Sequence, residues 1–145
     1  MKRKIVALLA AIVAWQLGAA APRTEIFAIK GTDTLRMDFY STTAEDAPCL
    51  VFMFGGGFIR GTRNAQQYID FFEDMASRGY AVATIDYRLG LTPLLTATQK
   101  PSVGDLVGLL TNSVDIAVED LYSATSHLVA SADRLGIDPA KIIIS

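Results

Sequence analysis

Residues 51–63 read VFMFGGGFIRGTR: an apolar run, three adjacent glycines and then a basic stretch. Each glycine gives up packing surface and loses more backbone entropy on folding than any other residue. The run CLVFMF at 49–54 is apolar at every position, which is typical of a strand buried on both faces of a parallel sheet. The glycines therefore stand where such a strand ends, at the sheet edge where open α/β folds bind ligands.

Glycines at this edge allow two interpretations. They can form a tight turn with no further role, or they can remove the Cβ atoms that would keep a substrate away from backbone N–H groups. Two N–H groups directed at one point would stabilise an oxyanion. A phosphate loop is disfavoured, because the chain has no G-x-x-x-x-G-K-[ST] and the glycines are not spaced as G-x-G-x-x-G. The triplet alone does not decide between the turn and the oxyanion interpretation.

The flanking segments alternate between strand and helix patterns. TEIFAIK (24–30) and TLRMDFY (34–40) alternate with period two around Gly31-Thr32-Asp33 and predict an antiparallel hairpin. A polar loop follows at 41–48. Residues 64–80 predict a helix with its C-cap at Gly79, and YAVATIDY (80–87) predicts a buried strand. The apolar face of that helix comprises Tyr68, Phe71, Phe72 and Met75.

The rest of the chain predicts one more helix and one more strand. Residues 88–112 contain two prolines and three glycines and are expected to be irregular. A helix is expected from about Ser113 to Leu135, capped by Gly136. Asp138-Pro139 predicts a turn, and KIIIS (141–145) predicts the start of a buried strand. The expected packing stripe of the second helix is Val114, Val118, Leu121, Leu128 and Leu135.

These elements follow the order β-β-β-α-β-α-β, an antiparallel hairpin followed by a parallel βαβαβ unit. The fold class is α/β with an incomplete sheet. Parallel sheets normally carry helices on both faces and more strands than this. A buried strand at the last residue, with no helix after it, leads us to expect that the sequence is cut short.

The first 20 residues have the layout of a secretory signal peptide. Lys2, Arg3 and Lys4 precede an apolar stretch that ends at Trp15, and small residues follow. The stretch is short for a membrane span, which favours a cleaved signal; an uncleaved anchor is the alternative. We therefore expect a secreted or periplasmic protein whose only membrane contact is through the signal peptide.

Composition excludes several classes of site. Removal of the signal peptide shifts the net charge from −2 to about −5, which disfavours nucleic acid as a partner. The single Cys49 is expected to be a small buried apolar side chain. The single His127 lies within the second predicted helix and is expected at its surface or boundary. One Cys and one His cannot form a thiolate or imidazole metal cluster, so we expect no metal and no cofactor.

Three segments in order resemble the α/β-hydrolase fold, in its carboxylesterase and hormone-sensitive-lipase-like branch: GGGF (55–58), IDYRLG (85–90) and the segment 119–145. The resemblance covers residues 24–145, as a partial domain after the signal peptide at 1–20. It implies that the N–H groups of Gly56 and Gly57 form an oxyanion hole. Site support is implied for Phe54, Gly55, Phe58, Asp86, Tyr87 and Arg88.

Two features depart from the family pattern. Phe54 occupies the position where the family usually has His, so the bonds that order the loop must come from elsewhere. No G-x-S-x-G occurs in the 145 residues, and Ser145 would precede the first glycine of that elbow. Asp120 matches an acidic residue of the family's helix, although a solvated surface acid is an equal alternative.

The resemblance therefore implies the N-terminal fragment of a secreted serine carboxylic-ester hydrolase that lacks nucleophile, acid and base. The 145 residues alone are expected to be inactive. The expected substrate of the whole enzyme is a small-molecule or carbohydrate-linked ester. A non-catalytic binding or adhesion protein of the same fold is the alternative.

Overall fold

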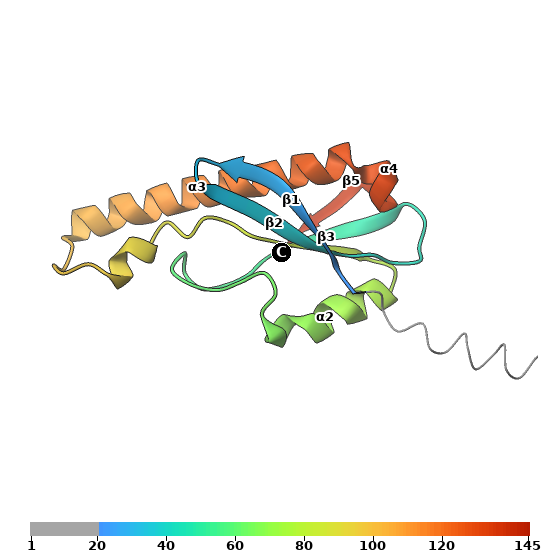
Figure 1. The fold of residues 1–145 in the computed structure, drawn as a ribbon, viewed down its shortest axis with the longest axis horizontal. Coiled ribbons are helices and arrows are strands. Elements are labelled where there is room, and N and C mark those ends of the chain that lie inside the picture. Colours follow the sequence, from blue (N-terminus) through green and yellow to red (C-terminus); the bar gives the residue numbers. More distant parts are fainter. Residues whose placement is uncertain (1–20) are drawn as a thin grey trace, which may run out of the picture.

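The computed structural model describes residues 21–145, so the expected signal peptide lies outside the described residues. A five-stranded sheet in the order β1-β2-β4-β3-β5 forms the centre of the fold (Figure 1). Its strands are β1 (Arg23–Lys30), β2 (Asp33–Tyr40), β3 (Ala47–Met53), β4 (Ala81–Ile85) and β5 (Ile137–Ile144).

Strand directions agree with the sequence pattern. β1 and β2 form the predicted antiparallel hairpin, and β2 pairs antiparallel with β4. β3 lies between β4 and β5 and is parallel to both. The carboxyl ends of β3, β4 and β5 therefore meet at one edge of the sheet.

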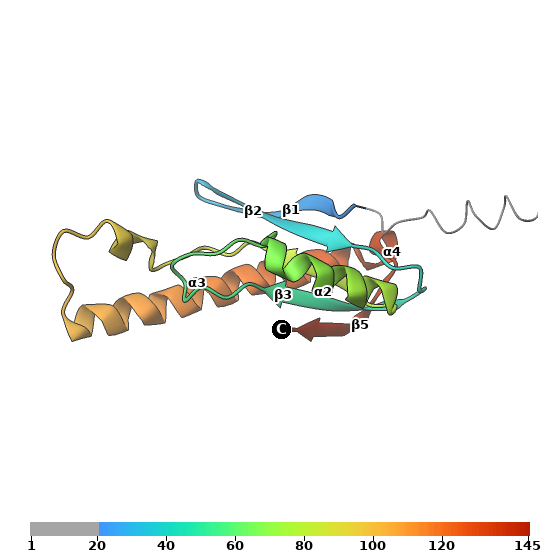
Figure 2. The ribbon, with the colours of Figure 1, turned by 90° about the horizontal axis from the view of Figure 1, so that it is seen from below.

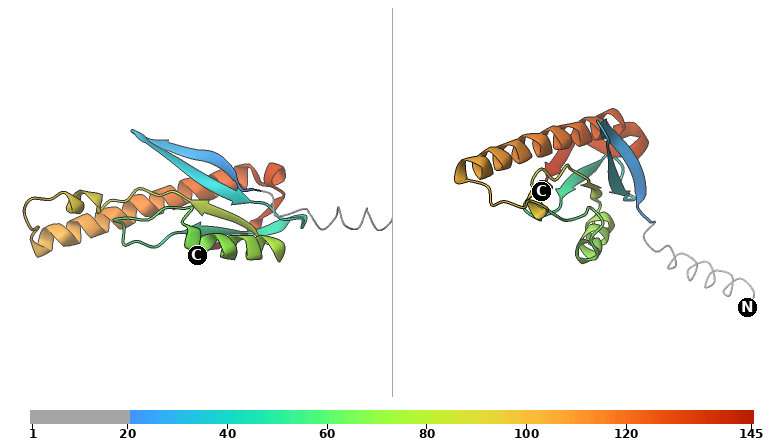
Figure 3. Two further views of the ribbon diagram at one scale, coloured as in Figure 1. Left: turned by 60° about the horizontal axis from the view of Figure 1, so that its bottom comes forward. Right: turned by 60° about the vertical axis from the view of Figure 1, so that its left-hand side comes forward.

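Helices cover both faces of the sheet. α2 (Gln66–Ser77) lies on one side and α3 (Val103–Ala130) on the other, as Figures 1 and 2 show. The short helix α4 (Ala132–Leu135) follows α3, and a 3₁₀ turn, η1 (Thr92–Leu95), precedes it. The N-terminal half of α3 extends past the sheet (Figure 3). No helix of residues 21–145 has the length and apolar character needed to cross a membrane.

The two faces have separate cores, because alternate side chains of each strand point to opposite sides. The core on the α2 face contains Phe72 and Tyr40. The core on the α3 face is larger and includes Cys49, whose side chain is fully buried as expected. Burial raises the pKa of the Cys49 thiol to about 12.

α3 begins ten residues earlier than predicted, so residues 103–112 are helical and not irregular. Ser102 is the N-cap: its hydroxyl accepts a hydrogen bond from the Asp105 N–H, and the Asp105 carboxylate accepts one from the Ser102 N–H. This capping box satisfies donors that a helix start leaves free. It outweighs the low helix propensity of Gly104 and Gly108.

The expected packing stripe of this helix is wrong in its first half. Val114 and Val118 are 41% and 58% exposed, whereas Leu128 and Leu135 are buried as expected. Small and polar side chains face the sheet instead, and they allow the helix backbone to approach it closely. The residues of α3 that are buried are Ser113, Ala117, Asp120, Ala124 and Leu128.

β5 also differs from the prediction. It begins at Ile137, so Asp138-Pro139 lies within the strand at an irregularity in its pairing with β3. Ile143 and Ile144 are 44% and 57% exposed, because β5 is an edge strand of the described sheet. The expectation that both faces of this strand are buried is therefore wrong.

Candidate active site

The end of β5 lies directly beside the start of the glycine loop. The Ser145 N–H donates to the Val51 carbonyl at 2.9 Å, and the Met53 N–H donates to the Ser145 carbonyl at 2.9 Å. Ser145 is thus paired with the last residues of β3, which lead into Phe54 and the glycines. Residues 54–58 and the end of β5 share the carboxyl edge of the sheet.

The glycine loop has a conformation that requires glycine. Gly56 has a φ of +151°, and a Cβ at this position would overlap the carbonyl oxygen of Arg60. Gly57, at a φ of +64°, is left-handed as well. The loop turns back on itself here, and the Ile59 N–H donates to the Gly56 carbonyl at 3.3 Å. A side chain at Gly56 would open this turn.

Within residues 21–145, the N–H groups of Gly56 and Gly57 donate no hydrogen bond to the protein. Gly55, Gly56 and Gly57 are all exposed. Two successive backbone N–H groups on an exposed loop can donate hydrogen bonds to an anionic oxygen.

Phe54 fills the position where the resemblance leads us to expect His. Its ring is 4% exposed and lies 4.6 Å from the ring of Tyr87, tilted by 30°. The Tyr87 hydroxyl donates to the Phe54 carbonyl at 2.7 Å. Burial raises the pKa of Tyr87, so this hydroxyl stays protonated and remains a donor. Tyr87 therefore supplies one of the bonds that order the loop.

Phe58 follows the glycines in a left-handed conformation, with a φ of +60°. Such a conformation is uncommon for a bulky side chain. The Leu91 N–H donates to the Phe58 carbonyl at 2.9 Å, and the Phe58 ring meets Tyr87 edge-on. The segment after β4 thus holds the loop at a second position.

Arg63, at the end of the loop, is a residue that the sequence pattern did not identify. Its Nη1 donates to both carboxylate oxygens of Asp86 at 2.9 Å, and its Nε lies 3.0 Å from Asp38 Oδ2. Only the basic character of 60–63 hinted at a charged role. Asp86, which the resemblance assigns to site support, is one of its two partners.

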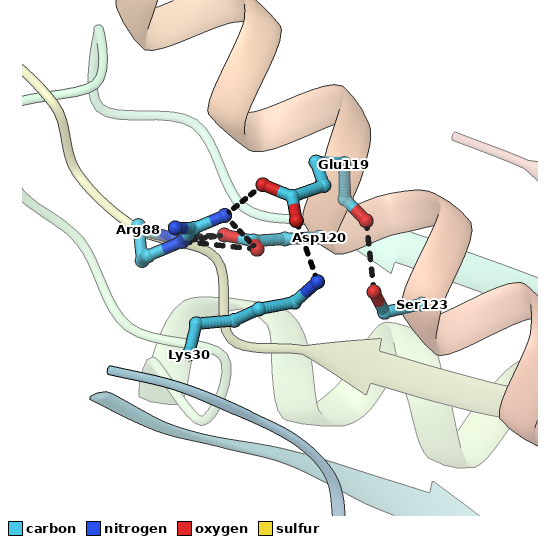
Figure 4. Close-up of polar contacts among 5 residues, drawn as sticks. All are labelled: Lys30, Arg88, Glu119, Asp120 and Ser123. Atoms are coloured by element: carbon cyan, nitrogen blue, oxygen red, sulfur yellow. Dashed lines mark hydrogen bonds and ion pairs between the residues drawn. The ribbon is translucent and has the colours of Figure 1, made fainter. Parts of the chain in front are cut away.

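Arg88 and Asp120 form a pair that connects the end of β4 to α3 (Figure 4). Asp120 is fully buried and accepts bonds from Arg88 Nε at 3.0 Å and Nη2 at 2.7 Å. It also accepts the backbone N–H of Arg88 at 2.8 Å. These bonds raise the pKa of Arg88 further above its ordinary value. The alternative of a solvated Asp120 is wrong.

Glu119 extends this pair to the hairpin. Its carboxylate accepts from Arg88 Nη2 and from Lys30 Nζ, each at 2.6 Å (Figure 4). Lys30 is the last residue of β1, so the network joins β1, the end of β4 and α3. It supports the edge of the sheet without contacting the glycines.

His127 is not part of this edge. Its Nε2 lies 3.0 Å from Glu25 of β1, which is the edge strand opposite β5. The side chain is partly buried against β1, consistent with the expected helix-boundary position. Residues 21–145 contain no group of three or more His, Cys, Asp or Glu side chains that could hold a metal.

Two cavities open beside the loop. A cavity of about 250 Å³ lies against Gly55 and Gly56, with Tyr68 and Arg60 also in its wall. A larger cavity of about 940 Å³ lies between the loop end and the segment after β4, and Asp86 and Arg88 line it. Phe54, Gly61 and Thr62 contribute to the walls of both cavities.

Comparison with known proteins identifies the fold. A family model described as BD-FAE matches residues 37–100. Among solved structures, the chain is similar to native thermophilic esterase Est2 from the Planctomycetes species Thermogutta terrifontis, with a TM-score of 0.64 and 24% identity over 87% of this chain and 40% of that chain. For the propionate-bound form of that esterase, the TM-score is 0.64 and the identity is 24%, over 87% of this chain and 41% of that chain. For Thermogutta terrifontis esterase 2 phosphoramylated by tabun, the TM-score is 0.65 and the identity is 24%, over 88% of this chain and 42% of that chain.

The chain spans about two fifths of the length of these esterases. No match was found among curated proteins. The similarity in structure shows the fold, which is that of the N-terminal part of an α/β-hydrolase. The predicted fold class is therefore confirmed.

Proposed function

We propose that this chain, with the fold of the N-terminal part of an α/β-hydrolase, is the oxyanion-stabilising part of a serine carboxylic-ester hydrolase. The observation that carries the proposal is that the N–H groups of Gly56 and Gly57 donate no hydrogen bond within residues 21–145, in a loop that begins where Ser145 pairs with Met53. In this fold the nucleophile elbow directly follows that strand. The residue after Ser145 would emerge next to the base of the glycine loop.

The reaction would proceed through an acyl-enzyme. A serine hydroxyl, deprotonated by a histidine, attacks the ester carbonyl carbon, and the carbonyl oxygen takes up the negative charge. The N–H groups of Gly56 and Gly57 would hold that oxygen until the alcohol leaves with the proton. Loss of one such donor costs about 3–4 kcal/mol of transition-state stabilisation in enzymes of this chemistry. Water then releases the acid by the same steps.

The smaller cavity supports a small acyl group. Its volume of about 250 Å³ lies just below the range of about 300–1,000 Å³ that is usual for ligand pockets, and Gly56 forms part of its wall. Thermogutta terrifontis Est2 has been solved with propionate and with butyrate bound. By analogy, we propose short-chain acyl esters as substrates, with either a small or a carbohydrate alcohol. The signal-peptide pattern of residues 1–20 supports a secreted or periplasmic location.

The experiment is to read the gene after the Ser145 codon and to express the polypeptide with the sequence found there. Gly-x-Ser-x-Gly at the junction and hydrolysis of p-nitrophenyl propionate, abolished when the elbow serine is changed to alanine, would support the proposal. The 145-residue chain is the control and is expected to show no turnover. If the lengthened polypeptide folds, has another residue in place of the elbow serine and hydrolyses no ester, the result would favour the alternative, a binding or adhesion protein.

A further inference from the structure

We propose that Arg63 is a positioning residue that holds the glycine loop in the conformation of an oxyanion hole. Arg63 lies at the far end of the loop from Phe54 and does not touch the glycines. It acts through the main chain, by fixing the point at which the loop returns to the sheet. What the positioned N–H groups then do rests on the proposed function.

The guanidinium of Arg63 lies between two carboxylates on separate elements. Asp38 belongs to β2, and Asp86 follows β4. Nη1 donates to both oxygens of Asp86 at 2.9 Å, and Nε lies 3.0 Å from Asp38 Oδ2. The contact with Asp38 is an ion pair without a hydrogen bond, because Nε has no hydrogen-bond partner within residues 21–145. The guanidinium places separate nitrogens near the two carboxylates, which the single ammonium group of a lysine would not do.

Both carboxylates are themselves fixed. Asp38 is 5% exposed and accepts the Thr24 hydroxyl at 2.6 Å. Asp86 exchanges two hydrogen bonds with the backbone of Arg36: it accepts the Arg36 N–H at 3.1 Å and donates its own N–H to the Arg36 carbonyl at 2.8 Å. Arg63 is therefore attached to rigid positions of the sheet.

The main chain of Arg63 is fixed as well. The hydroxyl of Thr84, a fully buried residue of β4, donates to the Arg63 carbonyl at 2.8 Å. At the other end of the loop, Tyr87 holds the Phe54 carbonyl. Both ends of the loop are thus bound to the same short segment, 84–87. The glycines between them have the greatest conformational freedom of any residue type, so their order depends on these two ends.

Arg63 is not placed to bind substrate. Its side chain is only 18% exposed, and two carboxylates already neutralise its charge. Burial by itself lowers the pKa of Arg63, but the bond and charge of Asp86 and the charge of Asp38 outweigh it and raise the pKa above its ordinary value. The guanidinium is therefore a permanent internal cation and not a free anion receptor.

The test compares Arg63→Gln and Arg63→Lys with Arg78→Gln in the 145-residue chain. Arg78 is a matched control, because it pairs with Asp74 on the exposed side of α2. The measurement is the ¹⁵N order parameter of Gly56 and Gly57. We expect it to fall from about 0.85 to below about 0.6 in Arg63→Gln, to fall less in Arg63→Lys, and to stay unchanged in Arg78→Gln. Amide exchange at Ile59, which closes the loop turn, should accelerate about tenfold while that of β3 does not.

Unchanged order parameters of Gly56 and Gly57 in Arg63→Gln would overturn the proposal. Amide exchange that accelerates equally over the whole sheet would also overturn it, because that result indicates a general structural role. If Arg63→Gln does not fold, Arg63→Lys must still lower the order parameter, and an unchanged value there overturns the proposal. These measurements need no ester. In the polypeptide expressed with the sequence that follows Ser145, Arg63→Gln should lower kcat for ester hydrolysis with little change in KM. Loss of loop order without any wild-type hydrolysis would overturn the proposed function and leave the positioning role in place.

Discussion

The two faces of the sheet attach their helices by different means. On the α2 face, aromatic rings interlock: Phe72 lies within 5.0 Å of Phe52, ring centre to ring centre, and 5.4 Å from Tyr40. On the α3 face, the middle of the helix presents alanines to the sheet. Aromatic side chains bury large areas, whereas alanine buries little and instead permits close approach.

On the α3 face, ion pairs add to the contacts between the helices and the strands. Asp120 pairs with Arg88, Glu119 with Lys30, and Glu25 of β1 with Arg134 of α4. On the other side, the ion pair of α2 is internal to that helix and exposed. The helix α2 is therefore held by aromatic packing, whereas α3 combines the larger apolar core, which its C-terminal half contacts, with polar links to β1 and to the end of β4.

Phe72→Ala should have the largest effect. The ring is fully buried at the centre of the aromatic cluster, so truncation leaves a cavity. We expect a loss of about 3–5 kcal/mol in the free energy of unfolding, measured by urea titration. Phe71→Ala is the control, because Phe71 is 43% exposed and should cost much less. Equal losses would show that the cluster has no single centre.

Asp120→Asn should follow, with a loss of about 3 kcal/mol, because it removes the buried carboxylate from Arg88 and leaves only the exposed Glu119 as a charged partner. Asp115→Asn, at an exposed position of the same helix, should change little. The combined variant Arg88→Gln with Asp120→Asn should lose less than the sum of the two single changes. Simple additivity would contradict a coupled pair.

Ala124→Leu tests the close approach of α3. Ala124 is fully buried against the sheet, so added methylenes must displace the helix. We expect a loss of about 1–3 kcal/mol in thermal or urea unfolding. Ala130→Leu, at an exposed position, should be neutral. A stabilised Ala124→Leu would show that unfilled space lies between helix and sheet.

The smallest effect should be the pH dependence of the Glu25 link. Hydrogen bonds from Arg134 lower the pKa of Glu25 to about 2, against the opposing effect of burial, and His127 and Arg23 reinforce the shift. Because the pKa is lowered from 4.5, the stabilisation is present above pH 4.5 and is lost as the pH falls towards 2. Both arginines are about half exposed, so we expect about 1–2 kcal/mol at pH 7.

The measurement is the difference in unfolding free energy between wild type and Glu25→Gln at pH 7, 4 and 3. The difference should shrink at each step. A difference that does not change with pH would show that Glu25 contributes by packing alone.

Local sequence patterns predicted the element order: period-two alternation predicted the hairpin, and continuous apolar runs separated by helical periodicity predicted the parallel strands. They missed the start of α3, where two glycines and Pro101 suggested a break and the capping box at Ser102 was decisive. Periodicity also placed Val114 and Val118 on the packing face of the helix, where they do not lie. Hydropathy favours large apolar side chains and does not reveal that small residues of the helix pack against the sheet.

For the site, motif resemblance identified the segments at the edge but not how they are tied together. The partners of Arg63 lie more than 20 residues away in both directions, and Arg88 and Asp120 are 32 positions apart. No spacing rule links such residues, because the topology of the sheet alone brings them together. The role of Gly56 and Gly57 in catalysis stays a prediction.

Cys49 offers a further use of the fold. It is the only thiol in the sequence, it is fully buried in β3, and its pKa of about 12 keeps it protonated at neutral pH. A thiol reagent can therefore modify the chain only after the centre of the sheet has opened. The rate at which Cys49 is labelled therefore measures how often the sheet opens. The same measurement on each variant shows how the substitution changes the lifetime of the folded state, without an engineered probe.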